Sequence, residues 1–322
     1  MNATDEVTVL AGGVGAARFL RGLVAAIDQD RVTAVVNTGD DTELHGLAIS
    51  PDLDTIVYTL ADAIDPERGW GLAGESWQAM TALARYTPVR PAGSAAGSTW
   101  FRLGDRDLAT HLYRTARLAE GATATEVATE IGAAWNVGIA LLPMTDGQFR
   151  TMIVLADGGE TVAFQDYFVR LQHAVRIESI GFQQEGCHLS AAARAALERS
   201  DVVVIAPSNP LVSIGPIRAL PGVDALLASR RDSVVAVSPI VGGHALKGPA
   251  DRMMAELGIE PTVAGIARLY AAIAGTLVID TVDAGLAGDV EAAGMRCVVT
   301  ETVMSSRDVA RSLALACVAA AR

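Results

Sequence analysis

The sequence predicts an α/β fold in which a doubly wound, mostly parallel sheet carries a largely helical insertion over its carboxyl edge. Short β-branched apolar runs alternate with amphipathic helical patterns near both ends of the chain. The middle of the chain is mostly helical in pattern. Of the 322 residues, 51% are hydrophobic and only 5% are aromatic, and 31 are glycines, which favours a helix-rich α/β protein over a β-sandwich.

The first unit reads strand, helix, strand. Residues 7–11 form a β-branched apolar run typical of a buried strand, and a glycine turn, Gly12-Gly13-Val14-Gly15, follows it. A helical pattern covers residues 16–27, and residues 32–37 form a second buried strand. This order predicts a right-handed crossover and parallel pairing of the two strands.

The same alternation returns in the last part of the chain. Further apolar runs predict strands over residues 202–206, 234–238, 276–280 and 296–300. Helical patterns lie around them over residues 191–199, 223–229, 249–257, 262–274 and 306–321. Two early and four late strands predict a six-stranded, Rossmann-like sheet.

The middle of the chain differs from both ends. We predict a Rossmann-like core made of residues 1–55 and 187–322, and an insertion over residues 56–186. Short alternating runs at residues 152–155 and 161–164 predict a hairpin within the insertion. Because ligands of doubly wound folds bind at the carboxyl edge of the sheet, we expect the insertion to cap that edge.

Charge and composition argue against several classes of protein. The formal net charge is −12, whereas a surface that binds duplex nucleic acid should be basic, so we expect no nucleic-acid partner. No run approaches the ~18–20 apolar residues that cross a bilayer, so we expect no membrane span. Three unclustered cysteines and an acidic start predict a protein of the reducing cytoplasm.

The glycine turn is the first segment that could carry chemistry. Backbone amides at the start of a helix bind phosphate, and glycines let the phosphate approach. Arg18 stands where a dinucleotide-binding turn has its third glycine, and the second strand ends in Asn37 rather than in an acid. We therefore favour phosphate binding over a turn needed only for packing, and both over NAD binding.

Acidic pairs follow at two further places. Asp40 and Asp41 come after the second strand, where they could cap a helix or hold Mg²⁺, which prefers carboxylates and phosphate oxygens. Asp52 and Asp54 precede a helical run. Only one of these two can cap that helix, so we expect the other to hold a cation or a substrate hydroxyl.

A dense charged segment lies further on, just before a predicted helix. In it, Arg102 or Arg106 could grip an anion, or the segment could be a solvated turn with local ion pairs. His111 stands one turn into the helix, and we expect it to be a structural histidine.

A polar turn follows the strongest late strand. Two prolines bracket Ser208 and Asn209, which predicts a rigid ligand loop at the carboxyl end of that strand. After the next strand, Lys247 could neutralise a phosphate or be an ordinary exposed lysine.

Seven strings of residues stand in one order along the chain. They are Leu-Ala-Gly-Gly-Val-Gly-Ala-Ala-Arg-Phe-Leu (10–20), Val-Val-Asn-Thr-Gly-Asp-Asp (35–41), Ser-Pro-Asp-Leu-Asp-Thr (50–55), Asp-Pro-Glu-Arg-Gly-Trp-Gly (65–71), Leu-Gly-Asp-Arg-Asp-Leu-Ala-Thr-His (103–111), Ala-Pro-Ser-Asn-Pro (206–210) and Ser-Ile-Gly-Pro-Ile (213–217). Together they resemble the 2-phospho-L-lactate transferase family of deazaflavin coenzyme biosynthesis, especially its actinobacterial phosphoenolpyruvate transferase branch.

The resemblance implies a reaction. The family transfers a phosphorylated three-carbon acid from a guanosine diphosphate-linked donor to the deazaflavin alcohol Fo (7,8-didemethyl-8-hydroxy-5-deazariboflavin) in coenzyme F420 biosynthesis. GMP is released, Mg²⁺ assists, and no covalent enzyme intermediate is required. The resemblance also implies a cytoplasmic homodimer, in which the insertion forms part of the deazaflavin site.

It further implies roles at the acceptor side. Asp54 looks like the catalytic residue, contacting the acceptor and orienting or deprotonating its hydroxyl, with Thr55 beside it in the substrate site. Asp40 and Asp54 look like the metal-holding pair. Arg102 occupies a position that is basic in archaeal relatives, so it is a further substrate-binding candidate.

At the donor side, the resemblance places phosphate against Gly12, Gly13 and Gly15. Ser208 and Asn209 are expected to face the guanosine diphosphate part. The other acids of these segments are reserve candidates: Asp41, Asp52, Asp105 and Asp107.

Two other classes of protein compete with a transferase. A related family of gluconeogenesis factors, which resembles a nucleotide-sugar sensor, has a similar glycine turn and Asp-Asp segment, but is not expected to carry the strings at 103–107 and 207–210. A nicotinamide dehydrogenase ranks third. Whether the donor carries phosphoenolpyruvate or phospholactate is not encoded in any motif of the sequence.

Overall fold

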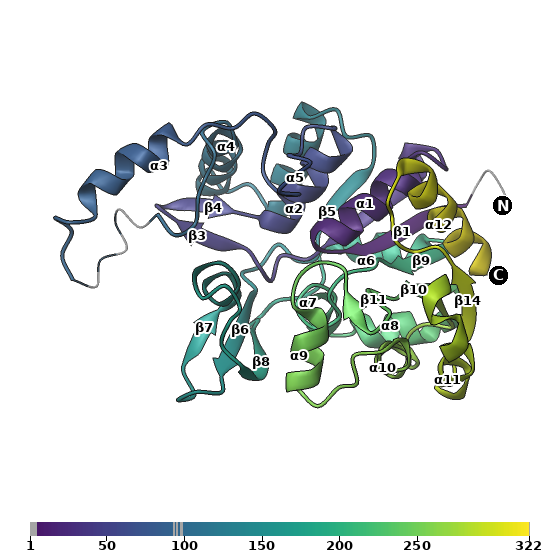
Figure 1. Ribbon diagram of the computed structural model, residues 1–322. Helices are drawn as coiled ribbons and strands as arrows, with labels where there is room; N and C mark the ends of the chain where they lie inside the picture. Colours follow the sequence, from purple (N-terminus) through teal and green to yellow (C-terminus); the bar gives the residue numbers. More distant parts are fainter. Residues whose placement is uncertain (1–4, 93, 95, 97–98, 322) are drawn as a thin grey trace.

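A seven-stranded parallel sheet forms the centre of the computed structural model, which describes residues 5–321 except 93, 95, 97 and 98 (Figure 1). The strand order is β14-β13-β10-β9-β1-β2-β5. The strands are β1 (Val7–Ala11), β2 (Val32–Val36), β5 (Ala140–Pro143), β9 (Val202–Ile205), β10 (Val234–Val237), β13 (Thr276–Asp280) and β14 (Arg296–Thr300). The predicted α/β fold with a Rossmann-like sheet is confirmed.

Both faces of the sheet are buried, because successive residues of a strand pack on opposite sides. In β9, Val202 and Val204 join one apolar cluster, whereas Val203 and Ile205 join another. The first face is covered by α1 (Gly13–Val24), α2 (Pro51–Leu60), α5 (Ala124–Ala134) and α12 (Arg307–Ala320). The second is covered by α6 (Ala191–Arg199), α7 (Gly215–Ala219), α8 (Val223–Ser229), α9 (Ala250–Glu256), α10 (Val263–Tyr270) and α11 (Ala287–Ala292).

The strand order reverses between β1 and β9. From β1 the chain proceeds through β2 to β5 at one edge, and from β9 it proceeds through β10 and β13 to β14 at the other. Leu10 of β1 pairs with Val35 on one side and Ile205 on the other. A crevice forms beyond the carboxyl ends of two strands that part in this way, and ligands of doubly wound sheets bind there.

All six predicted strands are present, and β5 is the seventh. It lies inside the segment 56–186 and pairs with β2, so this segment supplies an edge strand as well as cavity-lining elements. The predicted helices over 191–199 and 223–229 have the predicted bounds, whereas α1 begins at Gly13 rather than at residue 16, inside the glycine turn.

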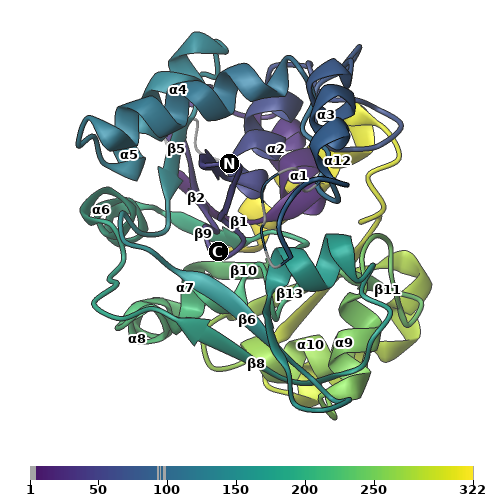
Figure 2. The same cartoon turned by 90° about the vertical axis from the view of Figure 1, so that its left-hand side faces the viewer.

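The predicted hairpin is confirmed and belongs to a second, antiparallel sheet. It joins β6 (Arg150–Leu155) to β7 (Thr161–Ala163), and β8 (Ile177–Gln183) pairs on the other side of β6. In Figure 2, β6 and β8 cross below the helices α4 (Asp107–Ala119) and α5. The remaining short elements are α3 (Gln78–Leu83) and the hairpins β3 (Thr42–Leu44) with β4 (Leu47–Ile49) and β11 (Ile240–Val241) with β12 (His244–Ala245).

Among the described residues, no helix combines the length and the apolar character that a membrane span requires.

Candidate active site

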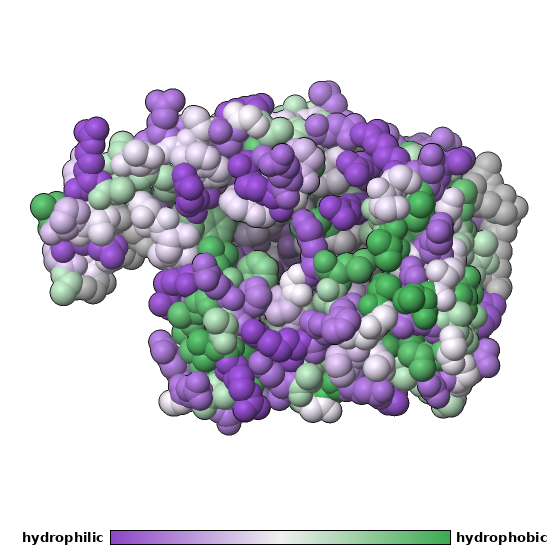
Figure 3. Space-filling model, viewed as in Figure 1, coloured by the Kyte–Doolittle hydropathy of each residue, from purple (hydrophilic) through white to green (hydrophobic). Residues whose placement is uncertain are grey.

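A cavity of about 340 Å³ lies at the carboxyl ends of β2 and β5, and its volume is in the range of small-molecule sites. Figure 3 shows the surface hollowed between the part of the chain that carries α2 to α4 and the three-stranded sheet. Asp54 and Arg114 give the cavity a charged wall, and Asp41 also lines it. Much of the rest is apolar, contributed by Ile49, Leu53, Val57, Leu118, Val127, Ile131 and Phe149.

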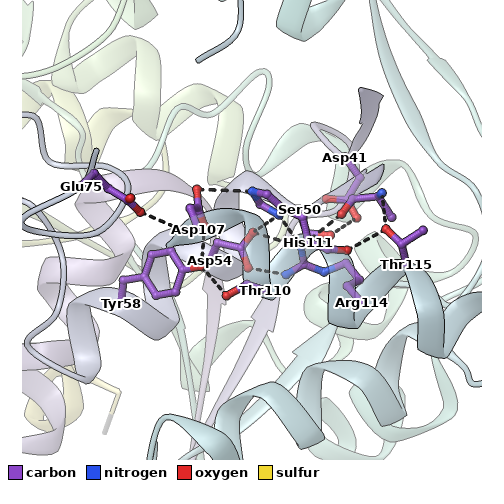
Figure 4. A network of polar contacts seen from close by, with 11 residues as sticks. Asp41, Ser50, Asp54, Tyr58, Glu75, Asp107, Thr110, His111, Arg114 and Thr115 are labelled. Carbon is purple, nitrogen blue, oxygen red and sulfur yellow. Dashed lines mark hydrogen bonds and ion pairs between the residues drawn. The ribbon is translucent and has the colours of Figure 1, made fainter. Parts of the chain in front are cut away.

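Asp54 stands in the first turn of α2, where it meets Arg114 of α4 (Figure 4). Arg114 Nη1 donates to Asp54 Oδ2 at 3.1 Å, and Nη2 donates to Oδ1. Both side chains are buried. Burial lowers the pKa of Arg114, but the charge of Asp54 outweighs it and the pKa lies above its ordinary value. A guanidinium that contacts both oxygens fixes the position of the carboxylate.

His111 extends this pair into a buried network. Arg114 Nη1 lies 3.2 Å from His111 Nδ1, and because arginine only donates, Nδ1 must accept. Nε2 then carries the hydrogen of the neutral ring, and it lies 3.3 Å from Asp107 Oδ2. Tyr58 donates to the other oxygen of Asp107 at 2.6 Å. The buried position of His111 is consistent with the predicted structural histidine, here one that braces Arg114.

Burial alone would raise the pKa of Asp107, but hydrogen bonds from His111 and Tyr58 bring it below its usual range. The carboxylate is therefore the stable form of this residue. Because Tyr58 also lies in α2, the network joins α2 to α4 at two places, Tyr58 to Asp107 and Asp54 to Arg114. The network thus fixes the two helices whose side chains form the charged wall of the cavity.

A second acidic group, formed by Asp40, Asp41 and Asp52, adjoins the cavity, which Asp41 itself lines. Burial, followed by the charge of Asp52, raises the pKa of Asp40 well above its usual range. Burial raises the pKa of Asp41 to about 8, although Ser50 donates to its Oδ2 at 2.8 Å. Asp40 Oδ1 and Asp41 Oδ1 are buried and have no hydrogen-bond partner among the described residues. Such orphaned carboxylate oxygens suit a cation.

Asp52 connects this acidic group to the glycine turn. It accepts the backbone amide of Gly13 and, at 2.9 Å, the side-chain amide of Asn37. Burial raises its pKa to about 6 despite these hydrogen bonds. The prediction that one aspartate of residues 52–54 caps the following helix is wrong: α2 has no side-chain cap, and Asp52 instead bonds the first turn of α1. Asp54 is paired with Arg114.

The glycine turn touches the turn that follows β9. Gly13 has φ of +70°, a conformation that glycine adopts freely. A Cβ on Gly15 would overlap the carbonyl oxygen of Pro207, so a larger residue there would push the two turns apart. The neighbouring Ser208 is buried, and its Oγ has no partner among the described residues. In Asn209, Oδ1 accepts the amides of Leu211 and Val212 and thus shapes the turn.

Among the described residues, one group of three has the spacing of a metal site. One ligand atom each of Asp54, Asp107 and His111 lies within 4.8 Å of the others. Arg114, however, already occupies both oxygens of Asp54. Asp40, Asp41 and Asp52 do not meet this spacing as a group of three, but their carboxylates offer only oxygen ligands, which Mg²⁺ prefers together with phosphate oxygens.

The structure places the other predicted site residues as follows. Thr55 is buried in α2 beside Asp54. Arg102 is exposed, its guanidinium 4.5 Å from the ring centre of Trp77, and it does not line the cavity. Asp105 accepts hydrogen bonds from Ser76 and from the backbone at the start of α3, which is a structural role.

Sequence reasoning missed Arg114. Its signal was available, because Asp107, His111 and Arg114 stand at helical spacing on one face of an amphipathic helix, where a buried arginine needs a partner. Arg150, which lines both the large cavity and the smaller one beside Asp40, was also missed. It stands at the start of a strand and has no local pattern that would mark it.

Comparisons with known proteins identify the family of the chain. The family model "2-phospho-L-lactate transferase CofD" matches residues 7–308. The phosphoenolpyruvate transferase of Streptomyces griseus is 41% identical over 315 residues, covering 96% of each chain. That of Mycobacterium tuberculosis is 41% identical over 295 residues, covering 85% of this chain and 86% of the relative.

A crystal structure of a UPF0052 family member from Bacillus halodurans has the same fold, with a TM-score of 0.60 at 16% identity over 97% of this chain and 98% of the other. The match to the family model spans most of the chain, and the relatives align along nearly all of it. The family predicted from the sequence is confirmed. The chain belongs to the 2-phospho-L-lactate transferase CofD family.

Proposed function

We propose that this transferase moves a phosphoenolpyruvyl or 2-phospho-L-lactyl group from a guanosine diphosphate-linked donor to the deazaflavin alcohol Fo, with release of GMP. The family supports the reaction class. The observation that carries the residue assignment is the joining of three features at one sheet edge. They are a cavity with the Asp54–Arg114 pair in its wall, a buried acidic group beside it, and the glycine turn at the switch point.

The acceptor is assigned to the large cavity. Its apolar walls from α2 and α5 suit a flat, largely apolar ring, and its charged wall suits a hydroxyl. Asp54 is the proposed hydrogen-bond acceptor for that hydroxyl, and Thr55 supports it from the same turn of α2. Arg114 keeps the carboxylate of Asp54 in place when the cavity is empty.

The donor is assigned to the crevice between the turns after β1 and β9. Gly12, Gly13 and Gly15 bring backbone amides of α1 close to a phosphate. One of these amides is already accepted by Asp52, so the phosphates bind beside that carboxylate. The buried hydroxyl of Ser208 is the proposed side-chain donor from the second turn, whose shape Asn209 maintains.

A diphosphate placed beside three aspartates requires a cation between them. The unpartnered oxygens of Asp40 and Asp41, together with Asp52, are the proposed Mg²⁺ ligands. Asp54, the other predicted metal ligand, is assigned to the acceptor because Arg114 already neutralises it. A bound Mg²⁺ would neutralise negative charge on the diphosphate during transfer.

The proposed step balances without a protein nucleophile. The ribityl hydroxyl oxygen of Fo attacks the phosphorus that bears the three-carbon acid, and a new phosphorus–oxygen bond forms. The bond from this phosphorus to the bridging diphosphate oxygen breaks, and GMP leaves with that oxygen. The hydroxyl proton passes to Asp54. The chain's own residues contribute positioning of both reactants and stabilisation of charge.

The decisive experiment supplies both possible donors. The protein is incubated with Fo, Mg²⁺ and either phosphoenolpyruvyl- or 2-phospholactyl-diphosphoguanosine, and products are identified by mass. We expect GMP and the phosphorylated deazaflavin, with faster turnover of the phosphoenolpyruvyl donor, because the relatives carry that name. Tight binding of a UDP-sugar without GMP release would instead favour a nucleotide-sugar sensor.

A homodimer is also proposed, from the resemblance alone, and a location in the reducing cytoplasm is proposed from the three unclustered cysteines. Light scattering behind a size-exclusion column measures the molar mass. For a chain of 33.4 kDa, a dimer should elute with twice that mass, and the mass of a single chain would contradict the proposal.

A further inference from the structure

Lys247 is the single lysine of the chain, in which Lys and Arg together number 25. It lies in the loop between β12 and α9, where its side chain is exposed. Arginine provides the cation everywhere else in the sequence. A compact ammonium, unlike a planar guanidinium, is a point charge that suits phosphate oxygens without a fixed geometry.

The loop that carries Lys247 is held in place. Both carboxylate oxygens of the buried Asp283 accept the amide of Gly242, at 3.2 and 3.0 Å, which fixes the turn between β11 and β12. The two elements that flank the loop are also in contact: His244 Nδ1 of β12 lies 3.4 Å from Asp251 Oδ2 of α9. β11 follows β10, the neighbour of β9 in the sheet, so the loop rises next to the switch-point crevice.

The ammonium of Lys247 reaches the first turn of α1 by way of Gly69. Gly69 has φ of +75°, and a Cβ placed on it would lie 2.6 Å from Lys247 Nζ and 3.8 Å from Val14 Cγ1. Gly69 thus lies close to both the ammonium and Val14, a residue of the glycine turn. A Cβ at this position would require the ammonium, the end of an exposed and flexible side chain, to shift.

Lys247 forms no ion pair with any residue that the structure describes. The glycine turn near the ammonium is in contact with the turn after β9, because Pro207 lies against Gly15. The turn after β9 also carries the buried, unpartnered hydroxyl of Ser208. Three groups therefore gather around the first turn of α1: a cation without an ion-pair partner among the described residues, a buried hydroxyl without a partner, and the amino end of the 12-residue helix itself. All three are complementary to an anion.

We propose that Lys247 is a donor-binding residue that closes the crevice over the diphosphate and pairs with its phosphate oxygens. This inference rests on the proposed function, since it assumes a nucleoside diphosphate in that crevice. It adds a positive charge to a site that Asp40, Asp41 and Asp52 would otherwise leave negative. It also gives a role to the turn at Gly69, which brings the acceptor-side segment against the donor.

The single lysine permits a direct test. Reductive methylation with ¹³C-formaldehyde labels only the α-amino group and Lys247, and Lys247→Arg identifies the lysine resonance by its loss. GDP with Mg²⁺ is the probe. We expect the Lys247 resonance to shift on titration with GDP. We also expect Lys247→Gln to bind GDP roughly tenfold more weakly in calorimetry, the range of one charge-assisted hydrogen bond.

Controls separate the possible failures. Arg268→Gln removes an exposed charge on α10, and its GDP affinity should stay within about twofold of the unmodified protein. Lys247→Arg should retain most of the affinity, and the KM for Fo should be unchanged in both Lys247 variants. Equal GDP binding by Lys247→Gln and the parent, with an unmoved resonance, overturns the role of Lys247 alone. Failure of the parent protein to bind GDP overturns the donor assignment itself.

Discussion

At Asp54, a single carboxylate is held by a guanidinium that is itself braced by a histidine and a second aspartate. Removing one partner of a buried charge pair leaves the other without compensation, which costs about 3–5 kcal/mol. Any variant of this pair must therefore be tested for folding as well as for activity. The roles of Asp54 and Arg114 can nevertheless be tested separately, because only Asp54 is assigned to touch the substrate.

Substitution at this pair should distinguish a catalytic role from a positioning role. Asp54→Asn keeps the size of the side chain and should lower kcat by about 10²-fold or more, the range of a lost general base. Arg114→Lys keeps the charge but loses the bidentate contact, and should lower kcat less while raising the KM for Fo. Steady-state GMP release measures both, with thermal unfolding as the control. Near-normal turnover by Asp54→Asn would contradict its assignment.

At the scale of single residues, the sequence identified the aspartates of the site but not the side chains and backbone groups that contact them. The Asp-rich strings marked Asp40, Asp41, Asp52 and Asp54, because paired acids at strand ends are visible locally. It could not show that Asp52 faces α1 while Asp54 faces α4, since the two point to helices far apart in the chain. Partner choice in a buried cluster is decided by tertiary packing.

Among the elements, α1 and the turn after β9 are packed without space for a side chain between them. Gly15 lies against the carbonyl of Pro207, whereas a Cβ added to Gly288 in α11 would meet no atom within 4 Å, which makes Gly288 a matched control. The close approach is what lets amides and a buried hydroxyl share one crevice. It also means that any increase in side-chain volume at Gly15 would disturb the packing of the two turns.

Gly15→Ala should destabilise the protein by about 1–3 kcal/mol, because the added methyl group overlaps backbone that cannot relax cheaply. Gly288→Ala should be neutral or slightly stabilising, since alanine is the better helix former. Urea unfolding followed by circular dichroism measures both. Equal stability of the two variants would show that the turns can separate freely.

Strands with a clear apolar pattern were predictable, including β14 at one edge of the sheet, whereas β5 at the other edge was not. The β-branched runs of β1, β9 and β10 are buried on both faces, so their composition is distinctive. β5 has four residues, begins with an exposed alanine and ends in proline. Such a strand is recognisable only by its pairing with β2, which no local pattern contains.

For the molecule as a whole, the protonation of Asp40, Asp41 and Asp52 makes the stability of the fold depend on pH and on bound metal. An aspartate in an unfolded chain loses its proton near pH 4, whereas Asp52 and Asp41 keep theirs to about pH 6 and 8 in the folded protein. Between these values the folded state binds more protons, so raising the pH favours unfolding. Carboxyls with a lowered pKa, such as Asp107, act in the opposite direction and at lower pH.

The metal-free protein should therefore lose stability from pH 5 to pH 8.5, and Mg²⁺ should restore more of it at the upper end, where the carboxyls are ionised. Asp41→Asn removes one of these titrations, and the fall in its Tm should be smaller by on the order of 2–4 °C. Scanning calorimetry with and without Mg²⁺ measures the difference. A fall in Tm identical in the variant and the parent would contradict the raised pKa of Asp41.

The contact between Gly15 and Pro207 also affects the order in which the protein can fold during translation. A ribosome finishes β1, β2 and β5 long before it reaches β9, so the emerging portion can build only one flank of the crevice. A truncated product that stops ahead of the Ala206–Asn209 turn lacks the second flank of the proposed donor site. If the donor binds there, the site is completed late in synthesis, in the step that adds β9 beside β1.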